Sequence, residues 1–142
     1  MADNVRLMKD VATAFANSDL APLYAAIDDN VVWRTGSSEP GLFRFSGQYR
    51  GRSGVTELMA KLAICYHFGR IVPQEFVADG DIVWGTFEVE AGYFAKLGDR
   101  VRLLRFDAAV RWRVKDGKVI EHRGYFDTAS LLVQQGELAR PA

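Results

Sequence analysis

The second half of the chain consists of four strand-like runs, and this feature limits its possible folds more than any other. Apolar and polar residues alternate through "HFGRIVPQEFVA", "DIVWGTFEVEA", "RVRLLRFDAAVRWRV" and "KVIEHRGYFD", and the turns "DG", "LGD" and "KDG" separate them. A period of two is typical of strands, and short glycine turns join antiparallel neighbours. The pattern therefore predicts an antiparallel meander from about residue 66.

Before the meander, the spacing of apolar residues is helical. It predicts helices over residues 3–16, around 20–27 and over 51–66, with Ser53 as a cap of the third helix. "VVWRT" predicts an early strand, and the Gly- and Ser-rich residues 36–48 predict a loop. This order is typical of an α+β domain in which three N-terminal helices cover one face of a curved antiparallel sheet. We expect a single domain over residues 1–142, with a helical turn after the last strand and a frayed tail from about 136.

The overall composition argues against several classes of function. Lys plus Arg and Asp plus Glu both number 18, so the net charge is zero, which gives no general attraction to nucleic acid or an anionic membrane and favours self-association. The single cysteine cannot form an internal disulfide, and the first residues lack the basic and apolar segments of a signal peptide, so we expect a cytoplasmic protein. No Cys/His spacing indicates a metal site.

One of the two histidines lies on the apolar side of the last run. Ile120, His122, Gly124 and Phe126 share that side, and the preceding run has an apolar side that includes Trp112. If the two sides are continuous, His122 points inward with Trp112 as a neighbour. An imidazole titrates near neutral pH and could act as a general acid or base, whereas the alternative is a neutral histidine hydrogen-bonded in a pocket wall.

Three stretches carry a family resemblance: "NSDLAPLYAAIDDNVVWRT", "GQYRGRSGV" and "VRWRVKDGKVIEHRGYFDTASLL". Together they resemble the SnoaL-like group of the nuclear transport factor 2 superfamily, which includes steroid delta-isomerases, polyketide cyclases, scytalone dehydratase and limonene epoxide hydrolase. The resemblance implies a cone-shaped fold with a deep pocket between sheet and helices, a homodimer, and no required metal or organic cofactor. It does not fix the function, because this scaffold hosts several activities and also non-enzymes.

The residues that catalyse the steroid isomerase reaction are missing from the matching positions. Arg34 stands where that family has its proton-transferring carboxylate, and Val11 and Val110, or Ala109 if the register slips by one, stand where it has its oxyanion hole. The resemblance to epoxide hydrolases is partial and offers Asp127 near the end of the last run. We therefore exclude the steroid isomerase mechanism and expect acid/base chemistry of the isomerase, cyclase or dehydratase kind on a small hydrophobic, cyclic or carbonyl-bearing metabolite. A non-catalytic protein that binds such a molecule in the same pocket is the alternative.

Two interpretations of Glu88 conflict. Alternation alone turns Val83, Phe87 and Val89 inward, which leaves Trp84 and Glu88 in solvent. Alignment with the family turns Trp84 and Glu88 into the cavity instead, and we follow the alignment. A carboxylate facing apolar walls would have a raised pKa and could carry protons, whereas the alternative is a solvated or salt-bridged glutamate.

These arguments define a predicted site. His122 is the predicted acid or base, Glu88 its partner, and Arg34 the group that stabilises negative charge, unless Arg34 only pairs with a nearby carboxylate. Asp127 is a further catalytic candidate that could equally cap the last helix. The arginines of the third run are expected on the outer face, at a homodimer interface. The predicted substrate-binding residues, mostly aromatic and suited to an apolar ligand, are Trp33, Tyr49, Tyr66, Trp84, Val110, Trp112 and Phe126.

Overall fold

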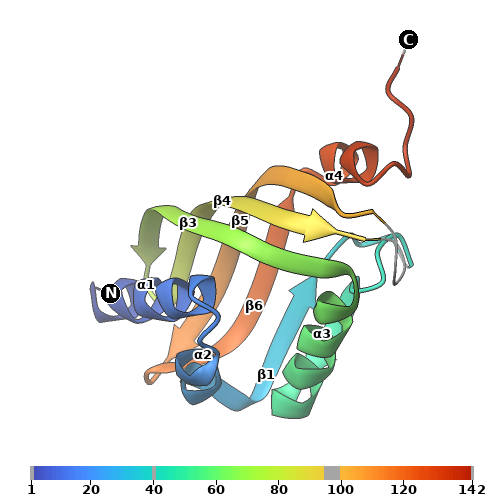
Figure 1. Ribbon diagram of the computed structural model, residues 1–142. Helices are drawn as coiled ribbons and strands as arrows, with labels where there is room; N and C mark the ends of the chain where they lie inside the picture. Colours follow the sequence, from blue (N-terminus) through green and yellow to red (C-terminus); the bar gives the residue numbers. More distant parts are fainter. Residues whose placement is uncertain (1, 40, 95–99, 142) are drawn as a thin grey trace.

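The computed structural model describes residues 2–39, 41–94 and 100–141. The helices and strands follow each other along the chain in the order shown in Figure 1. They are α1 (Ala2–Ala16), α2 (Ala21–Ala26), β1 (Ile27–Thr35), β2 (Gly47–Arg50), α3 (Gly51–Cys65), β3 (Tyr66–Asp79), β4 (Ile82–Tyr93), β5 (Arg102–Lys115), β6 (Lys118–Phe126) and α4 (Thr128–Gln134).

The strands form one six-stranded sheet in the order β2-β1-β6-β5-β4-β3. Strands β3 to β6 are successive antiparallel neighbours, as the alternating runs predict, and β1 pairs in parallel with β6. Figure 1 shows the sheet curving around α1, α2 and α3, with α4 at one end. The predicted α+β fold, with three N-terminal helices over a curved sheet, is confirmed.

The junction between the early strand and the third helix differs in detail from the prediction. Gly47–Arg50 forms β2 and pairs with the end of β1, whereas we expected a loop up to residue 48. Helix α3 begins at Gly51, so Ser53 lies inside its first turn and the expected cap is wrong. Gly51 has φ +70, and a Cβ there would lie 3.0 Å from the Asp29 carbonyl oxygen, so a side chain at this position would strain the turn into the helix. The expected "LGD" turn lies outside the described residues.

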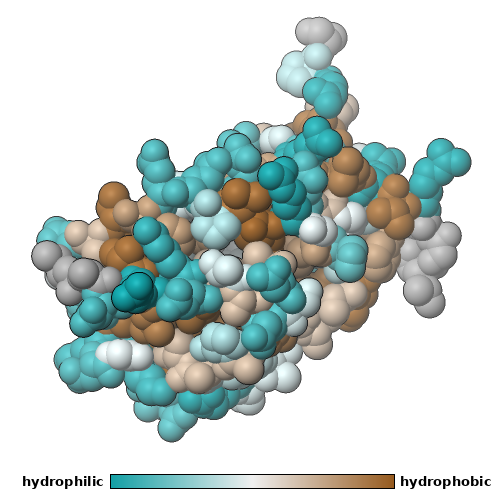
Figure 2. Space-filling model, turned by 60° about the vertical axis from the view of Figure 1, so that its left-hand side comes forward, coloured by the Kyte–Doolittle hydropathy of each residue, from teal (hydrophilic) through white to brown (hydrophobic). Residues whose placement is uncertain are grey.

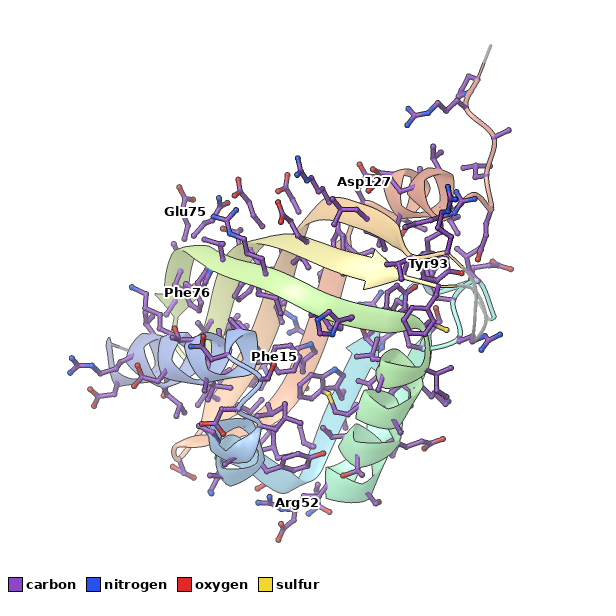
Figure 3. All side chains as sticks on the ribbon, in the orientation of Figure 1. Phe15, Arg52, Glu75, Phe76, Tyr93 and Asp127 are labelled. Atoms are coloured by element: carbon purple, nitrogen blue, oxygen red, sulfur yellow. The ribbon has the colours of Figure 1, made fainter. Side chains whose placement is uncertain are left out.

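Arg52 holds this junction together. Its guanidinium donates hydrogen bonds to the Asp29 carboxylate at 3.0 Å, to the Ile27 carbonyl at 3.1 Å and to the Tyr24 carbonyl. Figure 3 shows Arg52 at the end of the molecule where α2, β1 and α3 meet. These bonds fix β1, which carries part of the cavity wall, relative to α3.

The core lies between the concave face of the sheet and the helices. Met8 of α1, Leu58 of α3 and Leu104 of β5 are almost completely buried there. Polar side chains cover most of the surface on the α1 side, with separate apolar areas between them (Figure 2). No helix within the described ranges is long and apolar enough to cross a membrane.

Gly85 makes room for an aromatic stack in this core. A Cβ at Gly85 would lie 2.9 Å from the Phe76 ring and 3.0 Å from the Trp112 ring. The two rings stack with centroids 6.0 Å apart, and Figure 3 shows Phe76 between β3 and α1. The glycine therefore lets Trp112 lie flat against the inner face, where it forms part of a cavity wall.

Candidate functional site

An apolar cavity of about 210 Å³ lies between the sheet and the helices. Its wall includes Val11 and Phe15 of α1, Leu58 of α3, Phe87 of β4, Val110 of β5 and Leu131 of α4. Figure 3 shows Phe15 pointing from α1 into the space between helices and sheet. Pockets for drug-sized ligands measure roughly 300–1,000 Å³, so this cavity suits a smaller apolar metabolite.

His122 of β6 lies in the wall of this cavity between two tryptophans. Trp33 of β1 stacks on the imidazole with ring centroids 3.6 Å apart and 12° between planes. Trp112 of β5 donates a hydrogen bond from Nε1 to His122 Nδ1 at 3.0 Å. A neutral imidazole that accepts at Nδ1 carries its proton on Nε2. Nε2 has no hydrogen-bond partner among the described residues and lies on the cavity side, close to Gly124.

The surroundings of His122 keep its ring neutral. The imidazole is half-buried and lines the cavity. Burial lowers the pKa of His122 to about 3, and the positive charge of the neighbouring Arg123 acts in the same direction. The Trp112 N–H also disfavours protonation of His122 at Nδ1, because two N–H donors would then face each other. At neutral pH His122 is therefore a hydrogen-bond donor to the cavity.

Most of the predicted binding residues lie on the cavity wall, although their contact with a ligand stays a prediction. Those on the wall are Trp33, Tyr66, Val110, Trp112 and Phe126. Tyr49 does not reach the cavity, because its buried hydroxyl donates to the Phe45 carbonyl at 3.0 Å. Trp84 lies on the outer face of the sheet, 37% exposed and stacked on Tyr125.

Glu88 lies on the outer face, opposite to the orientation that we expected. Val83, Phe87 and Val89 are buried, and the side chains between them on β4 point away from the cavity. Glu88 is exposed in a polar depression that it shares with Arg105 and with other charged side chains. The alignment was wrong here and the alternation was right, because turning the strand over would expose these three buried apolar side chains.

Arg34 also lies on the outer face. Trp33 and Thr35, its neighbours on β1, face the cavity, so Arg34 must face away and is exposed beside Arg123 of β6. No ion pair joins Arg34 to another residue in the described part of the chain, and the carboxylate of Asp29, also on β1, pairs with Arg52. The structure does not bring Arg34 to His122.

Asp127 caps a helix. Its carboxylate accepts a hydrogen bond from the Ser130 N–H at 3.0 Å at the start of α4, and its side chain is exposed (Figure 3). This is the alternative role that the sequence left open. The predicted catalytic carboxylates are therefore both outside the cavity, and only His122 of the predicted catalytic side chains lines it.

Two residues that we did not predict for the site accompany His122. Thr35 and Gly124 line the cavity beside it. An added Cβ on Gly124 would lie 3.7 Å from Thr35 Oγ1 and 3.8 Å from His122 Nε2. The alternation in "VVWRT" could have placed Thr35 on the face of Trp33, but its proximity to Gly124 depends on the parallel β1–β6 pairing, for which the sequence carries no local signal.

Tyr66 is another titratable residue of the cavity wall. Its hydroxyl accepts a hydrogen bond from Nε2 of the buried Gln135 at 2.7 Å. Burial raises the pKa of Tyr66 well above its usual range, so the phenol is neutral. Nothing in the sequence pointed to Gln135, because its partner is far away along the chain. Among the residues that the structure describes, no group of His, Cys, Asp and Glu could hold a metal ion.

Solved structures share this fold across almost the whole chain. TerC co-crystallised with polyporic acid has a TM-score of 0.78 at 20% identity, covering 94% of this chain and 98% of TerC. AclR from Streptomyces galilaeus, a suggested hydroxylase, has a TM-score of 0.73 at 20% identity, with 99% and 89% covered. A suggested isomerase from Rhodopseudomonas palustris has a TM-score of 0.70 at 20% identity, with 91% and 92% covered. At these identities the likeness concerns the fold alone.

The family follows from the sequence match. No curated protein matches the chain. Residues 8–122 match the SnoaL-like domain, which covers well over half of the chain and includes every strand except the end of β6. This chain belongs to the SnoaL-like domain family.

Proposed function

We propose that this protein is a cofactor-independent enzyme of the isomerase, cyclase or dehydratase type, and that it acts on a small apolar metabolite with a carbonyl group. The observation that carries the proposal is a single neutral imidazole with its N–H turned into a largely apolar cavity. The suggested isomerase and the ligand-bound TerC among the similar structures support a small-molecule function of this kind.

The structure favours a different role for His122 from the acid or base that we predicted. A neutral imidazole can polarise a carbonyl by hydrogen bonding, and such donors are worth most where water is excluded. A C–H bond next to the carbonyl then breaks, its electron pair forms the carbon–carbon double bond of an enolate as negative charge moves to the oxygen, and the proton passes to water. Return of a proton to another carbon completes an isomerisation.

The test uses 2-tetralone, a ketone with exchangeable protons next to its carbonyl, as a probe in D2O. We expect the protein to accelerate deuterium incorporation, followed by NMR, and His122→Gln to lose most of that acceleration. His67→Gln is the matched control, because His67 is exposed and does not line the cavity. Equal acceleration by both variants would remove His122 from the mechanism.

A non-catalytic binding protein is the second candidate. It is favoured by one observation, namely that no carboxylate lines the cavity within the described ranges. A binding protein would be stabilised by 2-tetralone against heating without accelerating exchange. It would lose that stabilisation mainly when Trp112 is truncated, whereas the enzyme would lose exchange in His122→Gln and keep most of its affinity.

A homodimer through the outer sheet face and a cytoplasmic location complete the proposal. Trp84 and Tyr125 are 37% and 45% exposed on that face, and Arg123 lies 4.9 Å from the Tyr125 ring centre. Exposed stacked aromatics of this kind are enriched at protein interfaces. Sedimentation should show a dimer for the wild type and a monomer for Trp84→Glu. Glu57→Ala is the control, since Glu57 is exposed on α3, which lies over the opposite face of the sheet.

A further inference from the structure

We propose that Thr35, Gly124 and His122 form a seat for one oxygen atom of the ligand. The proposal rests on the proposed function, because it assumes that the cavity takes a small organic molecule. It goes further by naming the point at which the ligand is held and the chemistry that this point selects. We call this point the oxygen seat and define it by Thr35 Oγ1, His122 Nε2 and the space in front of Gly124.

The geometry of the seat comes from a missing side chain. The place that a Cβ of Gly124 would take lies 3.7 Å from Thr35 Oγ1 and 3.8 Å from His122 Nε2. Any larger residue at position 124 would fill this space. Glycine leaves it open to the cavity, which Thr35, His122 and Gly124 all line. Because both polar atoms lie within 4 Å of this one point, we expect an atom that enters in front of Gly124 to approach both of them.

Both polar atoms are available as donors. No hydrogen bond joins Thr35 Oγ1 or His122 Nε2 to another group in the part of the chain that the structure describes, and neither is buried without access. Nε2 carries the proton because the Trp112 N–H occupies Nδ1. The threonine hydroxyl rotates and can donate as well. Two converging donors select an acceptor, such as a carbonyl oxygen, and disfavour a group that can only donate.

Trp112 is the positioning residue of this seat. Its indole N–H, 3.0 Å from Nδ1, fixes which ring nitrogen carries the proton, and the Trp33 stack fixes the plane of the ring. With the proton on Nδ1 instead, Nε2 would present a lone pair to the cavity and repel a carbonyl oxygen. The tryptophan thus determines the hydrogen-bonding character of the cavity without touching the oxygen seat itself.

The seat also explains how an apolar cavity could stabilise charge. Two donors fixed in advance around an oxygen in an apolar site are the arrangement that stabilises an enolate or another oxyanion. The wall contributes no fixed negative charge in the described part of the chain, so nothing opposes such an anion. A ligand that lacks the oxygen would still fit the apolar walls but would leave both donors unpaired.

The experiment compares 2-tetralone with tetralin, the same ring system without oxygen, by calorimetric titration. Thr35→Val removes one donor at nearly constant volume. Gly124→Ala fills the seat, and the fold should tolerate it because both neighbours would be at ordinary contact distances. The matched control is Gly69→Ala, since Gly69 is also a strand glycine but is exposed and does not line the cavity.

We expect the wild type to bind 2-tetralone about tenfold more tightly than tetralin, as one or two net hydrogen bonds predict. Thr35→Val and Gly124→Ala should each reduce this preference at least threefold, and Gly69→Ala should keep it. Nitrogen-15 NMR should show His122 with a proton on Nε2 in the wild type and a mixture of both neutral forms in Trp112→Phe.

The possible failures are distinct. A ketone preference that survives in both Thr35→Val and Gly124→Ala would overturn the oxygen seat, while leaving the apolar cavity as the ligand site. A proton on Nδ1 in the wild type would overturn the role of Trp112 and the seat with it. If the wild type binds neither 2-tetralone nor tetralin, the proposed function fails, and the seat fails for that reason.

Discussion

The two faces of the β-sheet treat their polar side chains differently. On the outer face, charged groups pair with each other in solvent: Arg113 donates to Asp81 at 3.0 Å and to Glu121 at 3.3 Å, and all three side chains are partly exposed. On the inner face, His122 is held between Trp33 and Trp112 and keeps its free N–H for the cavity.

Polar groups on the outer face therefore contribute little to stability, whereas those on the inner face contribute much more. Exposed ion pairs contribute roughly 0–1 kcal/mol each, so the outer face tolerates substitution. Burying a polar group in an apolar wall costs free energy unless the group is hydrogen-bonded. A protein can keep such a group only if other contacts compensate for this cost. Substitutions on the two faces should therefore have very different consequences.

The largest contrast is expected between two tryptophans. Trp112 is 6% exposed, and its ring packs on Phe76 and Phe87. Trp112→Ala should lower the free energy of unfolding by about 3–5 kcal/mol, because it leaves a cavity and removes the partner of His122. Denaturant unfolding followed by far-ultraviolet circular dichroism measures this loss.

Trp84→Ala is the control for the opposite face. It should cost about 1 kcal/mol or less, since Trp84 is partly exposed and loses little beyond its stack on Tyr125. Both variants should be measured at two protein concentrations, because association through the outer face would add to the loss in Trp84→Ala. Equal losses at low concentration would contradict the distinction between the faces.

The next contrast concerns the pH dependence of stability. Burial lowers the pKa of His122 to about 3 from about 6.5, so below pH 6.5 the unfolded chain takes up a proton that the native protein does not. The free energy of unfolding therefore falls as pH decreases from about 6.5 towards 3, by at most about 1.4 kcal/mol per pH unit and roughly 4 kcal/mol in total. The stability advantage of the wild type over His122→Gln should shrink over this range.

The comparison with His122→Gln is needed because carboxylates also titrate at low pH, and their contribution cancels in the difference. His67→Gln serves as the second control. Because His67 is exposed outside the cavity, this variant shows whether the loss of any histidine changes the profile. An advantage over His122→Gln that stays constant between pH 7 and 4 would show that the native protein does bind a proton at His122.

The inner face could be predicted from sequence where alternation was strong. The side shared by His122 and Phe126 and the apolar side that contains Trp112 both follow from a period of two, and the structure places all three on the cavity wall. The same rule placed Glu88 outside, and we went wrong only when we set the rule aside for the alignment. Burial of Phe87 and Val89 decides the orientation of that strand.

The oxygen seat could not be predicted, because it depends on contacts between distant segments. Thr35 and Gly124 come together through the parallel pairing of β1 with β6, in which Trp33 lies opposite His122. The sequence also does not show whether a glycine in a strand leaves an open space or allows a close contact with a neighbouring group. The prediction for Arg34 failed because it followed the family alignment and not the alternation. Its neighbours Trp33 and Thr35 face the cavity, so Arg34 faces away from it.

The smallest expected effect concerns Asp127, which adjoins the inner face in sequence but does not reach the cavity. Asp127→Ala removes the side chain that accepts the Ser130 N–H at the start of α4, so the free energy of unfolding should fall by about 1 kcal/mol. Asp127→Asn keeps a capping oxygen and should restore most of this loss. Deuterium exchange of 2-tetralone should be nearly unchanged in both variants, because α4 still contributes Leu131 to the wall. If Asp127→Asn kept the stability but abolished exchange, the carboxylate itself would be required, and the catalytic group would extend beyond the inner face of the sheet.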